Sequence, residues 1–263
     1  MIGWFAVPRD WIASGGDILK FCGQAFGDIF NARVFQFFGE ALRQAGILIL
    51  GSAMVIWGMV FILGLECGIE GAYFNRSVGA PAYAGVFSAW CDLREMVPYM
   101  FGYIMAAKVG TGIVAELGAM RINEEIDALQ VLGVDPVKNL VVPRFLALML
   151  VTGLLDVYAL IFGIFGGVLA EMVYHQNLAG FWATFFANAS VTDLWGSVVK
   201  TTIFGAIIAI VCCYKGMTAS GGAAGVGRAV NEAVVIAFSG IWAFNYVFTQ
   251  TLLATHPEIL VIR

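Results

Sequence analysis

The sequence predicts an all-α membrane protein: an N-terminal interfacial amphipathic helix, five transmembrane helices, and a short cytoplasmic helix between the second and third of them. Three observations predict this class. Of the 263 residues, 60% are hydrophobic and only 12% are charged, whereas soluble domains carry about 25% charged residues. The apolar residues gather in runs long enough to cross a bilayer. The 32 glycines suit close helix packing in lipid, where small residues let backbones approach. A soluble enzyme is therefore excluded.

The N-terminal region, residues 1–46, differs in its pattern of polar and apolar residues from the predicted transmembrane domain, residues 47–263. Between residues 17 and 31, polar side chains recur at three- and four-residue spacing opposite an apolar side, which is typical of an amphipathic helix. Aromatic residues flank this segment, so we expect it to lie in the membrane interface. The alternative is that its apolar side packs against other helices of the same protein. The N-terminus has no basic region followed by an apolar core, so we expect no cleavable signal peptide.

The five predicted spans are residues 47–65, about 96–114, about 145–173, about 197–214 and 233–254. Lys108 and Asp156 lie well inside spans, and the other charges are expected to mark the membrane interfaces. Ionisable residues within spans are candidate functional groups. Asp156 either pairs with a neighbouring helix, which we prefer, or faces a transport cavity. Gly163 and Gly167 form a small-xxx-small pair that predicts close helix packing.

The distribution of Lys and Arg sets the expected orientation. Five spans place the two termini on opposite sides of the membrane. With a cytoplasmic N-terminus, nine of the 14 Lys and Arg residues fall in inside segments and four fall outside. Cytoplasmic loops carry an excess of these residues. We therefore expect a multi-pass protein of the plasma (inner) membrane, with a cytoplasmic N-terminus and the C-terminus outside.

Charge and cysteine content argue against several functions. The net charge of −4, without a basic stripe, gives no sign of nucleic-acid binding. The five cysteines form no C-x-x-C pair, which disfavours zinc and redox chemistry. Cys67 and Cys91 are the pair that could form a disulfide, provided that both face an oxidising compartment. We find no Ser/His/Asp set, metal cluster or nucleotide site, and therefore expect no enzymatic activity.

The loop after the second span contains a predicted helix over residues 116–130. Good helix formers fill it, Arg121 and Glu125 stand at i, i+4, and Gly133 with Asp135-Pro136 ends it. Its apolar stripe is Ile122, Ile126, Leu129 and Leu132, and its free acidic residues are Glu116, Glu124 and Asp127. A short acidic amphipathic helix suits docking of a motor subunit. The alternative is a helix that only rests on the bilayer.

A second cytoplasmic segment, residues 214–232, is rich in glycine. Glycine-rich loops can bind phosphate at a helix N-terminus. No Gly-Lys-Ser/Thr closes this run and no strand precedes it, so neither a P-loop nor a dinucleotide-binding motif is present. A turn whose glycines permit tight chain reversal is the preferred interpretation.

Ordered motifs run through both segments. They are Glu116-Leu117-Gly118-Ala119-Met120, Glu124-Glu125-Ile126-Asp127-Ala128-Leu129, Leu132-Gly133-Val134-Asp135-Pro136, Leu140-Val141-Val142-Pro143-Arg144, Cys213-Tyr214-Lys215-Gly216, Ser220-Gly221-Gly222 and Gly225-Val226-Gly227-Arg228-Ala229-Val230. With these motifs the sequence resembles the MlaE/YrbE family of permeases, the membrane subunits of ABC-type lipid transporters that work with MCE-domain proteins. The sequence of residues 123–129, Asn-Glu-Glu-Ile-Asp-Ala-Leu, resembles in particular the actinobacterial YrbE branch, which serves Mce complexes.

The resemblance implies a set of site residues. Residues 116–130 would be the coupling helix that seats in a groove of a cytoplasmic ABC ATPase, with candidate residues Glu116, Gly118, Met120, Arg121, Glu124, Glu125, Asp127 and Leu129. The cytoplasmic glycine-rich loop contributes Lys215, Gly216, Gly221, Gly222, Gly225, Gly227 and Arg228. The chain itself would bind no metal or cofactor, because ATP and Mg²⁺ belong to the partner ATPase.

The resemblance also implies partners and a cargo. It predicts a second YrbE-type permease chain, as a heterodimer, and MCE-domain proteins outside the membrane. The cargo would be a lipid (fatty acid, sterol or phospholipid), with import preferred. One alternative is a proton-coupled secondary transporter or channel that uses Asp156 and Lys108 as relay groups. That class predicts inverted repeats with broken spans, and we find no repeat. A structural scaffold subunit is a further alternative.

Overall fold

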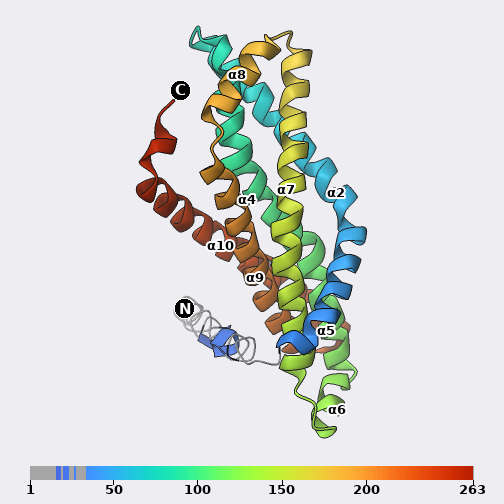
Figure 1. The fold of residues 1–263 in the computed structure, drawn as a ribbon. Helices are drawn as coiled ribbons and strands as arrows, with labels where there is room; N and C mark the ends of the chain where they lie inside the picture. Colours follow the sequence, from blue (N-terminus) through green and yellow to red (C-terminus); the bar gives the residue numbers. More distant parts are fainter. Residues whose placement is uncertain (1–15, 19, 24–26, 28–33, 263) are drawn as a thin grey trace, which may run out of the picture.

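The computed structural model describes residues 16–18, 20–23, 27 and 34–262, and these residues form helices and turns with no strand among them. Figure 1 shows a bundle of long, steeply inclined helices. Five helical segments are long and apolar enough to span a membrane: Phe38–Ser77, Ala84–Ile122, Val137–Val173, Val191–Met217 and Gly222–Thr255. The predicted all-α class and its five spans are therefore confirmed.

The first span is one helix, α2 (Val34–Ser77), and a short turn, η1 (Pro81–Tyr83), follows it. The second span, Ala84–Ile122, is composite. Its parts are α3 (Ala84–Ser88), a π-helical segment η2 (Ala89–Glu95), α4 (Met96–Met105), a second π-helical segment η3 (Ala106–Gly110) and α5 (Thr111–Ile122). Such π segments interrupt regular helices and are frequent near functional sites.

The remaining elements follow in chain order. They are α6 (Glu125–Val131), η4 (Val137–Val141), α7 (Val142–Val173), α8 (Leu178–Asn188), α9 (Val191–Met217), α10 (Gly222–Thr255) and η5 (Pro257–Leu260). In Figure 1, α6 and α8 lie at opposite ends of the bundle. The sequence did not predict α8. Asn177 caps it, because its side chain accepts hydrogen bonds from the backbone N–H groups of Ala179 and Gly180.

The helices extend beyond the predicted spans because hydropathy detects only the part that lies in hydrocarbon. α2 has 44 residues, or about 66 Å at 1.5 Å per residue, whereas the hydrocarbon core is about 30 Å thick. The boundary predicted between residues 46 and 47 falls inside α2. It marks the point at which the helix becomes apolar and not a break in the fold.

Glycines allow α2 and α7 to pack closely, and Figure 1 shows the two helices side by side. A Cβ on Gly64 would overlap the backbone of Gly163, and one on Gly68 would lie 2.8 Å from Cα of Gly167. The packing role predicted for Gly163 and Gly167 is confirmed. A disulfide between Cys67 and Cys91, with their Cα atoms 6.2 Å apart, further joins α2 to the second span.

The described part of the N-terminal segment packs on the bundle. Ile18, Phe21 and Cys22 contact the hydrophobic core, and the Phe21 ring lies 5.6 Å from the Tyr214 ring of α9. These contacts agree with the packing alternative, and the position of the segment in the membrane interface stays a prediction. The rest of the predicted amphipathic helix, residues 19, 24–26 and 28–31, lies outside the described residues.

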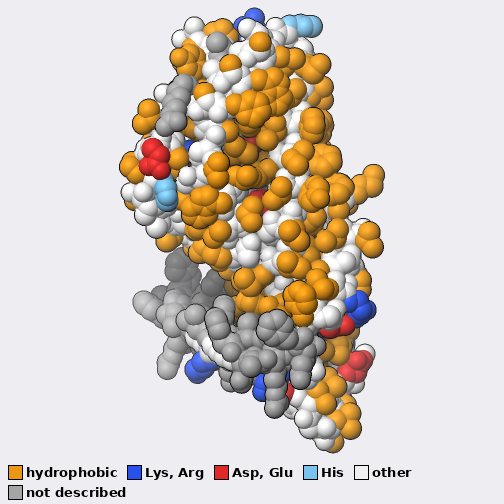
Figure 2. Space-filling view, viewed as in Figure 1, with side chains coloured by type: hydrophobic (Ala, Val, Ile, Leu, Met, Phe, Trp, Pro, Cys, Tyr) orange, Lys and Arg blue, Asp and Glu red, His pale blue; other side chains and the backbone are white. Residues whose placement is uncertain are grey.

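The outer surface of the bundle is apolar. Figure 2 shows hydrophobic side chains over most of the bundle's length on one face, with Lys, Arg, Asp and Glu more frequent near the α6 end. Leu50 and Met54 of α2 are 89% and 86% exposed. Side chains of this kind are stable at the surface only when lipid or another protein covers them. The surface therefore agrees with a membrane-embedded bundle.

Candidate functional site

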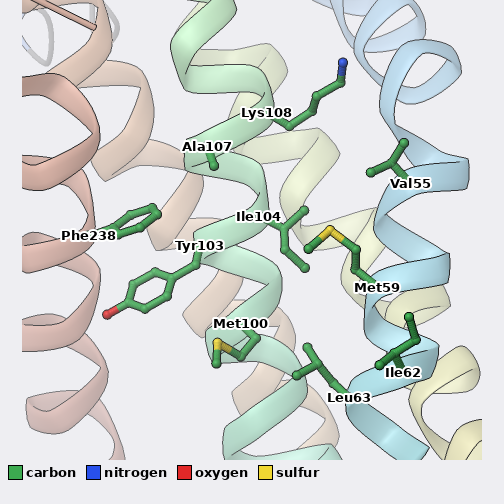
Figure 3. Close-up of a pocket in the computed structure, with 10 residues that line it drawn as sticks. All are labelled: Val55, Met59, Ile62, Leu63, Met100, Tyr103, Ile104, Ala107, Lys108 and Phe238. Carbon is green, nitrogen blue, oxygen red and sulfur yellow. The ribbon is translucent and has the colours of Figure 1, made fainter. Parts of the chain in front are cut away.

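An apolar pocket of about 570 Å³ lies between α2, the second span and α10. Its lining residues are Val55, Met59, Ile62, Leu63, Met100, Tyr103, Ile104, Ala107, Lys108 and Phe238. Tyr103 stacks on Phe238 with ring centroids 4.3 Å apart, which closes the α10 side. Figure 3 shows Lys108 at one end, beside Val55. The pocket combines an apolar lining with one cation at its end, and its volume is that of a small-molecule site.

The two charges expected inside spans occupy different environments. Lys108 is exposed on the pocket wall and has no ion-pair partner among the described residues. Asp156 of α7 is completely buried and accepts a 2.7 Å hydrogen bond from Ser197 Oγ of α9. The preferred interpretation of Asp156, pairing with a neighbouring helix, agrees with this contact. No direct hydrogen bond or ion pair joins these two residues.

A buried polar network lies in the half of the bundle nearer α8, and the sequence analysis missed it. The expectation that charges other than Lys108 and Asp156 mark interfaces was wrong for Arg94, Asp193 and Lys200, which are all buried. The Arg94 guanidinium donates to both Asp193 carboxylate oxygens, at 2.8 and 3.3 Å. This bidentate pair joins the second span to the first turn of α9.

Pro98 explains why Lys200 is drawn into the bundle. Proline has no N–H, so the carbonyl of Arg94, four residues earlier, loses its helical partner. The Lys200 ammonium donates to that carbonyl oxygen at 2.6 Å. In a membrane each free backbone group must find a partner within the protein, and the lysine of α9 meets this need. A proline four residues after an arginine was the sequence signal for this site.

Glu95 extends the network to α10. Its carboxylate accepts hydrogen bonds from Asn245 Nδ2 at 3.0 Å and from Thr249 Oγ1 at 2.7 Å, and it lies 3.8 Å from Lys200 Nζ. Polar contacts between spans are the usual means of fixing helices whose apolar surfaces lipid solvates equally well. The network therefore holds α10 against the second span, and both elements line the pocket, with α2 on its opposite side.

At the other end of the bundle, the predicted helix over residues 116–130 is two helices. α5 ends at Ile122, and α6 begins at Glu125 after Glu124, which has a left-handed backbone with φ of 61°. The predicted Arg121–Glu125 pair is wrong, because Arg121 instead bonds to Asp127 across the break. The predicted continuous stripe is also wrong, since Ile126 is buried while Leu132 is exposed.

The other predicted coupling residues divide into internal contacts and exposed positions. Glu116 binds Arg144 at 2.7 Å and ties α5 to the start of α7. Gly118 is buried, and a Cβ there would lie 2.9 Å from Val226 of α10. Met120 packs against the core. Glu124 and Glu125 are exposed, while Asp127 and Leu129 are partly exposed.

The most exposed apolar residues near α6 are not among the predicted coupling residues. Val131 and Leu132 are 87% and 76% exposed, at the α6 end of the bundle in Figure 1. Together with Glu124 and Glu125 they form a surface that we call the α6 tip. Adjacent apolar and acidic side chains at a protruding end are suited to a protein partner with a basic, partly apolar groove.

The glycine-rich loop is a tight reversal between α9 and α10. Gly221 and Gly222 have φ of 89° and 67°, which other residues rarely adopt. Gly225 packs against the Ser220 carbonyl, and a Cβ on Gly216 would lie 2.7 Å from Leu117 Cβ of α5. Gly227 has open space beside it. Lys215 pairs with Glu232 at 2.8 Å. These two residues and Arg228 line a polar pocket of about 210 Å³.

An all-helical bundle with five segments able to span a membrane and an apolar pocket between them fits a membrane transport protein. The sequence matches the family Permease MlaE over residues 41–251, and the chain belongs to that family. The chain is 32% identical over 232 residues to a Probable ABC transporter permease protein of Synechocystis, covering 85% of each chain.

Other relatives cover shorter parts. A Probable ABC transporter permease protein of Rickettsia typhi is 37% identical over 160 residues, which is 60% of this chain and 62% of that protein. The chain thus spans about three fifths of the length of its rickettsial relatives. Protein TRIGALACTOSYLDIACYLGLYCEROL 1 of Arabidopsis thaliana chloroplasts is 31% identical over 209 residues, covering 79% of this chain and 57% of that protein.

Proposed function

We propose that this chain is the transmembrane permease subunit of an ATP-driven lipid transporter. The observation that carries the proposal is the apolar pocket of about 570 Å³ between α2, the second span and α10. Its size and lining fit acyl chains, and the Lys108 ammonium at one end fits an anionic headgroup. The name of the Arabidopsis relative, which is that of a galactolipid, agrees with a lipid cargo.

Several features support a paired assembly with a separate motor. The pocket is formed on one chain, and a second permease chain against α2 and α10 would enclose it. The family membership supports an ABC ATPase as the motor, and we place its docking site at the α6 tip. ATP-driven closure of the ATPases would push the two α6 tips and change the affinity of the pocket for lipid. This requires two conformations of the permease that the motor stabilises to different extents.

The orientation, the outer partners and the direction follow from the same scheme. α6 lies in the cytoplasm, which puts the N-terminal end of α2 inside and the C-terminus outside. The Cys67–Cys91 disulfide is then in the half nearer the oxidising side, where such bonds persist. MCE-domain proteins would receive or deliver lipid there, with import as the direction. The actinobacterial assignment rests on residues 123–129 alone, and the relatives described above are rickettsial, cyanobacterial and plant proteins.

Filling the pocket tests the lipid site. Met59→Trp and Ile104→Trp add bulk to opposite walls, and Leu50→Trp adds the same bulk to a lipid-facing position of α2. We expect the pocket variants to lose most of the lipid that co-purifies with the wild type in mild detergent, measured by mass spectrometry of extracted lipid per mole of protein. Equal lipid content in all three variants and the wild type would show that the pocket is not the lipid site.

The α6 tip is tested separately. Leu132→Glu places a charge on a side chain that is 76% exposed, so the fold should survive. Gln130→Glu adds the same charge to an exposed position of the same helix and is the control. We expect Leu132→Glu to abolish co-purification of the ATPase and ATP-dependent lipid transport in proteoliposomes, and the control to retain both. Full retention of both by Leu132→Glu would refute docking at the tip.

The relay alternative makes a different prediction. It requires Lys108 and Asp156 to exchange protons, whereas Asp156 is buried against Ser197 and Lys108 faces the pocket. Under that alternative, transport would follow a pH gradient without ATP. Under our proposal, transport stops when ATP is removed, whatever the gradient.

A further inference from the structure

The polar pocket of about 210 Å³ lies at the reversal between α9 and α10, at the α6 end of the bundle (Figure 1). The glycine-rich motif builds it. Gly221 and Gly222 turn the chain back with their positive φ, and Gly225 packs directly on the Ser220 carbonyl. Because Gly221 has no side chain, the guanidinium of Arg228 can approach it: a Cβ there would lie 3.2 Å from Nη2 of Arg228. The motif therefore places an arginine back over the reversal.

The pocket holds an excess of positive charge. Lys215 and Glu232 line it and pair with each other at 2.8 Å, so the charge of this acid is already neutralised. Arg228 lines the same pocket, is exposed, and has no ion-pair partner among the residues that the structure describes. Its guanidinium presents N–H donors in a fixed fork that matches a carboxylate, and the exposed Ser220 hydroxyl can donate to the same group. The pocket is therefore suited to an anionic group with oxygen acceptors.

The reversal packs on the helix that leads to the α6 tip. A Cβ on Gly216 would lie 2.7 Å from Leu117 Cβ, and one on Gly118 would lie 2.9 Å from Val226, so both sides of the reversal contact α5. Gly118 precedes Glu124 of the tip by six residues, or about 9 Å at 1.5 Å per residue. A protein seated on the α6 tip is therefore within reach of the reversal.

The chemistry of the pocket selects its occupant. None of the described residues that line it has a long apolar side chain, so an acyl chain would find no contact there, which disfavours a membrane lipid. The α6 tip presents acids and the pocket presents a cation, and a partner that meets both is held in one orientation by opposite charges. We propose that the pocket binds an aspartate or glutamate side chain of the ABC ATPase through Arg228, as a second contact beside the α6 tip. This inference rests on the proposed function and adds a contact that the tip does not supply.

The test measures binding of the purified ATPase to the full chain in nanodiscs of phosphatidylcholine, a lipid without net charge. We expect Arg228→Gln to raise the dissociation constant about tenfold, and the difference to shrink at high ionic strength. Glu232→Gln releases Lys215 into the pocket and should lower the dissociation constant. The control is Arg76→Gln, which removes an exposed arginine in the last turn of α2 and should leave the dissociation constant unchanged.

A crosslink tests the contact directly. A carbodiimide joins an amine to a carboxylate in contact with it, with loss of water, and leaves a guanidinium unmodified. Arg228→Lys should therefore form a covalent adduct with the ATPase at residue 228, and mass spectrometry of its peptides would identify the acid. Arg76→Lys is the matched control and should form none at residue 76. Absence of an adduct at residue 228 would overturn the inference.

The binding data separate this inference from docking at the α6 tip. Unchanged binding in Arg228→Gln, with binding lost in Leu132→Glu, would leave docking at the tip intact and eliminate the pocket as a contact. Weaker binding in Arg228→Gln, with unchanged binding in Leu132→Glu, would refute the tip and support the pocket.

Two further results would overturn the inference. Equal losses in Arg228→Gln and Glu232→Gln would show that these charges only hold the reversal together. A loss in Arg228→Gln that appears only in nanodiscs containing an anionic lipid would assign the pocket to a lipid headgroup.

Discussion

The Arg94–Asp193 pair offers the sharpest test of the buried network. The side chains are 8% and 1% exposed, and the guanidinium also donates to the Ile259 carbonyl at 3.0 Å. Replacing Asp193 by Asn removes the charge but keeps the shape, and leaves a buried, uncompensated guanidinium. Breaking a buried ion pair in this way costs about 3–5 kcal/mol. At about 2–4 °C per kcal/mol for a chain of this size, we expect the Tm to fall by about 10 °C.

A double-mutant cycle separates lost charge pairing from lost packing. Arg94→Met alone leaves the Asp193 carboxylate buried, while Arg94→Met with Asp193→Asn leaves no buried charge at this contact. The double variant should therefore be more stable than the sum of the single effects predicts. The control is Glu232→Gln, which breaks the pair between Lys215 and the 59% exposed side chain of Glu232 and should lower the stability by less than about 1 kcal/mol.

The assay is thermal unfolding in detergent, followed with a dye that reacts with exposed thiols. Cys212 and Cys213 are buried in α9, so their reaction with the dye reports unfolding of the bundle. The reasoning is refuted if Asp193→Asn lowers the Tm no more than Glu232→Gln does. It is also refuted if the two single effects at Arg94 and Asp193 add without coupling, because a buried pair must couple.

Three further predictions concern backbone and disulfide. Gly118→Ala should lower the Tm because its Cβ would lie 2.9 Å from Val226, whereas Gly112→Ala, with nothing within 4 Å, should raise stability by about 0.5–1 kcal/mol; equal effects in thermal unfolding would contradict this packing. Glu124→Gly should stabilise the chain, by up to about 1 kcal/mol, because glycine adopts its φ of 61° without strain; an unchanged or lower Tm would count against it. In denaturant and before reduction, thiol titration should find three of the five cysteines free, and five free thiols would disprove the disulfide. Cys67→Ser, which removes the disulfide, should lower the free energy of unfolding by about 3 kcal/mol for a sequence separation of 24 residues.

The five spans could be predicted from the sequence because a bilayer imposes one simple requirement, a long apolar run, on each of them. The glycine contacts of Gly163 and Gly167 followed from spacing alone. The pocket could not be predicted, since its walls come from α2, the second span and α10, and only packing brings these together. Local sequence carries no record of which helix faces meet.

The buried network was missed for a different physical reason. Average hydropathy assigns charged residues such as Arg94 and Lys200 to interfaces, because isolated charges are unfavourable in lipid. In the structure each of them has a partner from another helix, Asp193 for Arg94 and the Arg94 carbonyl for Lys200. Pro98 was the local signal, because it removes a helical hydrogen bond and so creates a demand for a donor.

The break before α6 was missed because most of the residues around it favour a helix, with Asn123, the C-cap of α5, as the exception. Local propensity is weak, and tertiary contacts override it. Here the burial of Ile126 and the bond between Arg121 and Asp127 need the chain to turn at Glu124. The resemblance assigns this segment to a partner, which stays a prediction. The structure shows that Glu116 and Gly118 hold the segment to the bundle and that Val131 and Leu132 face outward.

The second span connects the α6 tip to the pocket in a way that constrains any coupling mechanism. The helical run from Ala84 to Ile122 contains both α5, which leads into α6, and the pocket residues Tyr103 and Lys108. A displacement of α6 therefore reaches the pocket along one helical axis. α5 in turn packs against α10 through Gly118, and Glu95 of the same span bonds to α10 near its other end. With α10 held at both ends, a rigid shift of the second span would carry Phe238 of α10 with it, and the pocket would change only through movement against α2, which lines it with Val55, Met59, Ile62 and Leu63. Bending of the span is the other way to reshape the pocket, and the π-helical segments η2 and η3, which flank α4, are where a helix kinks most readily.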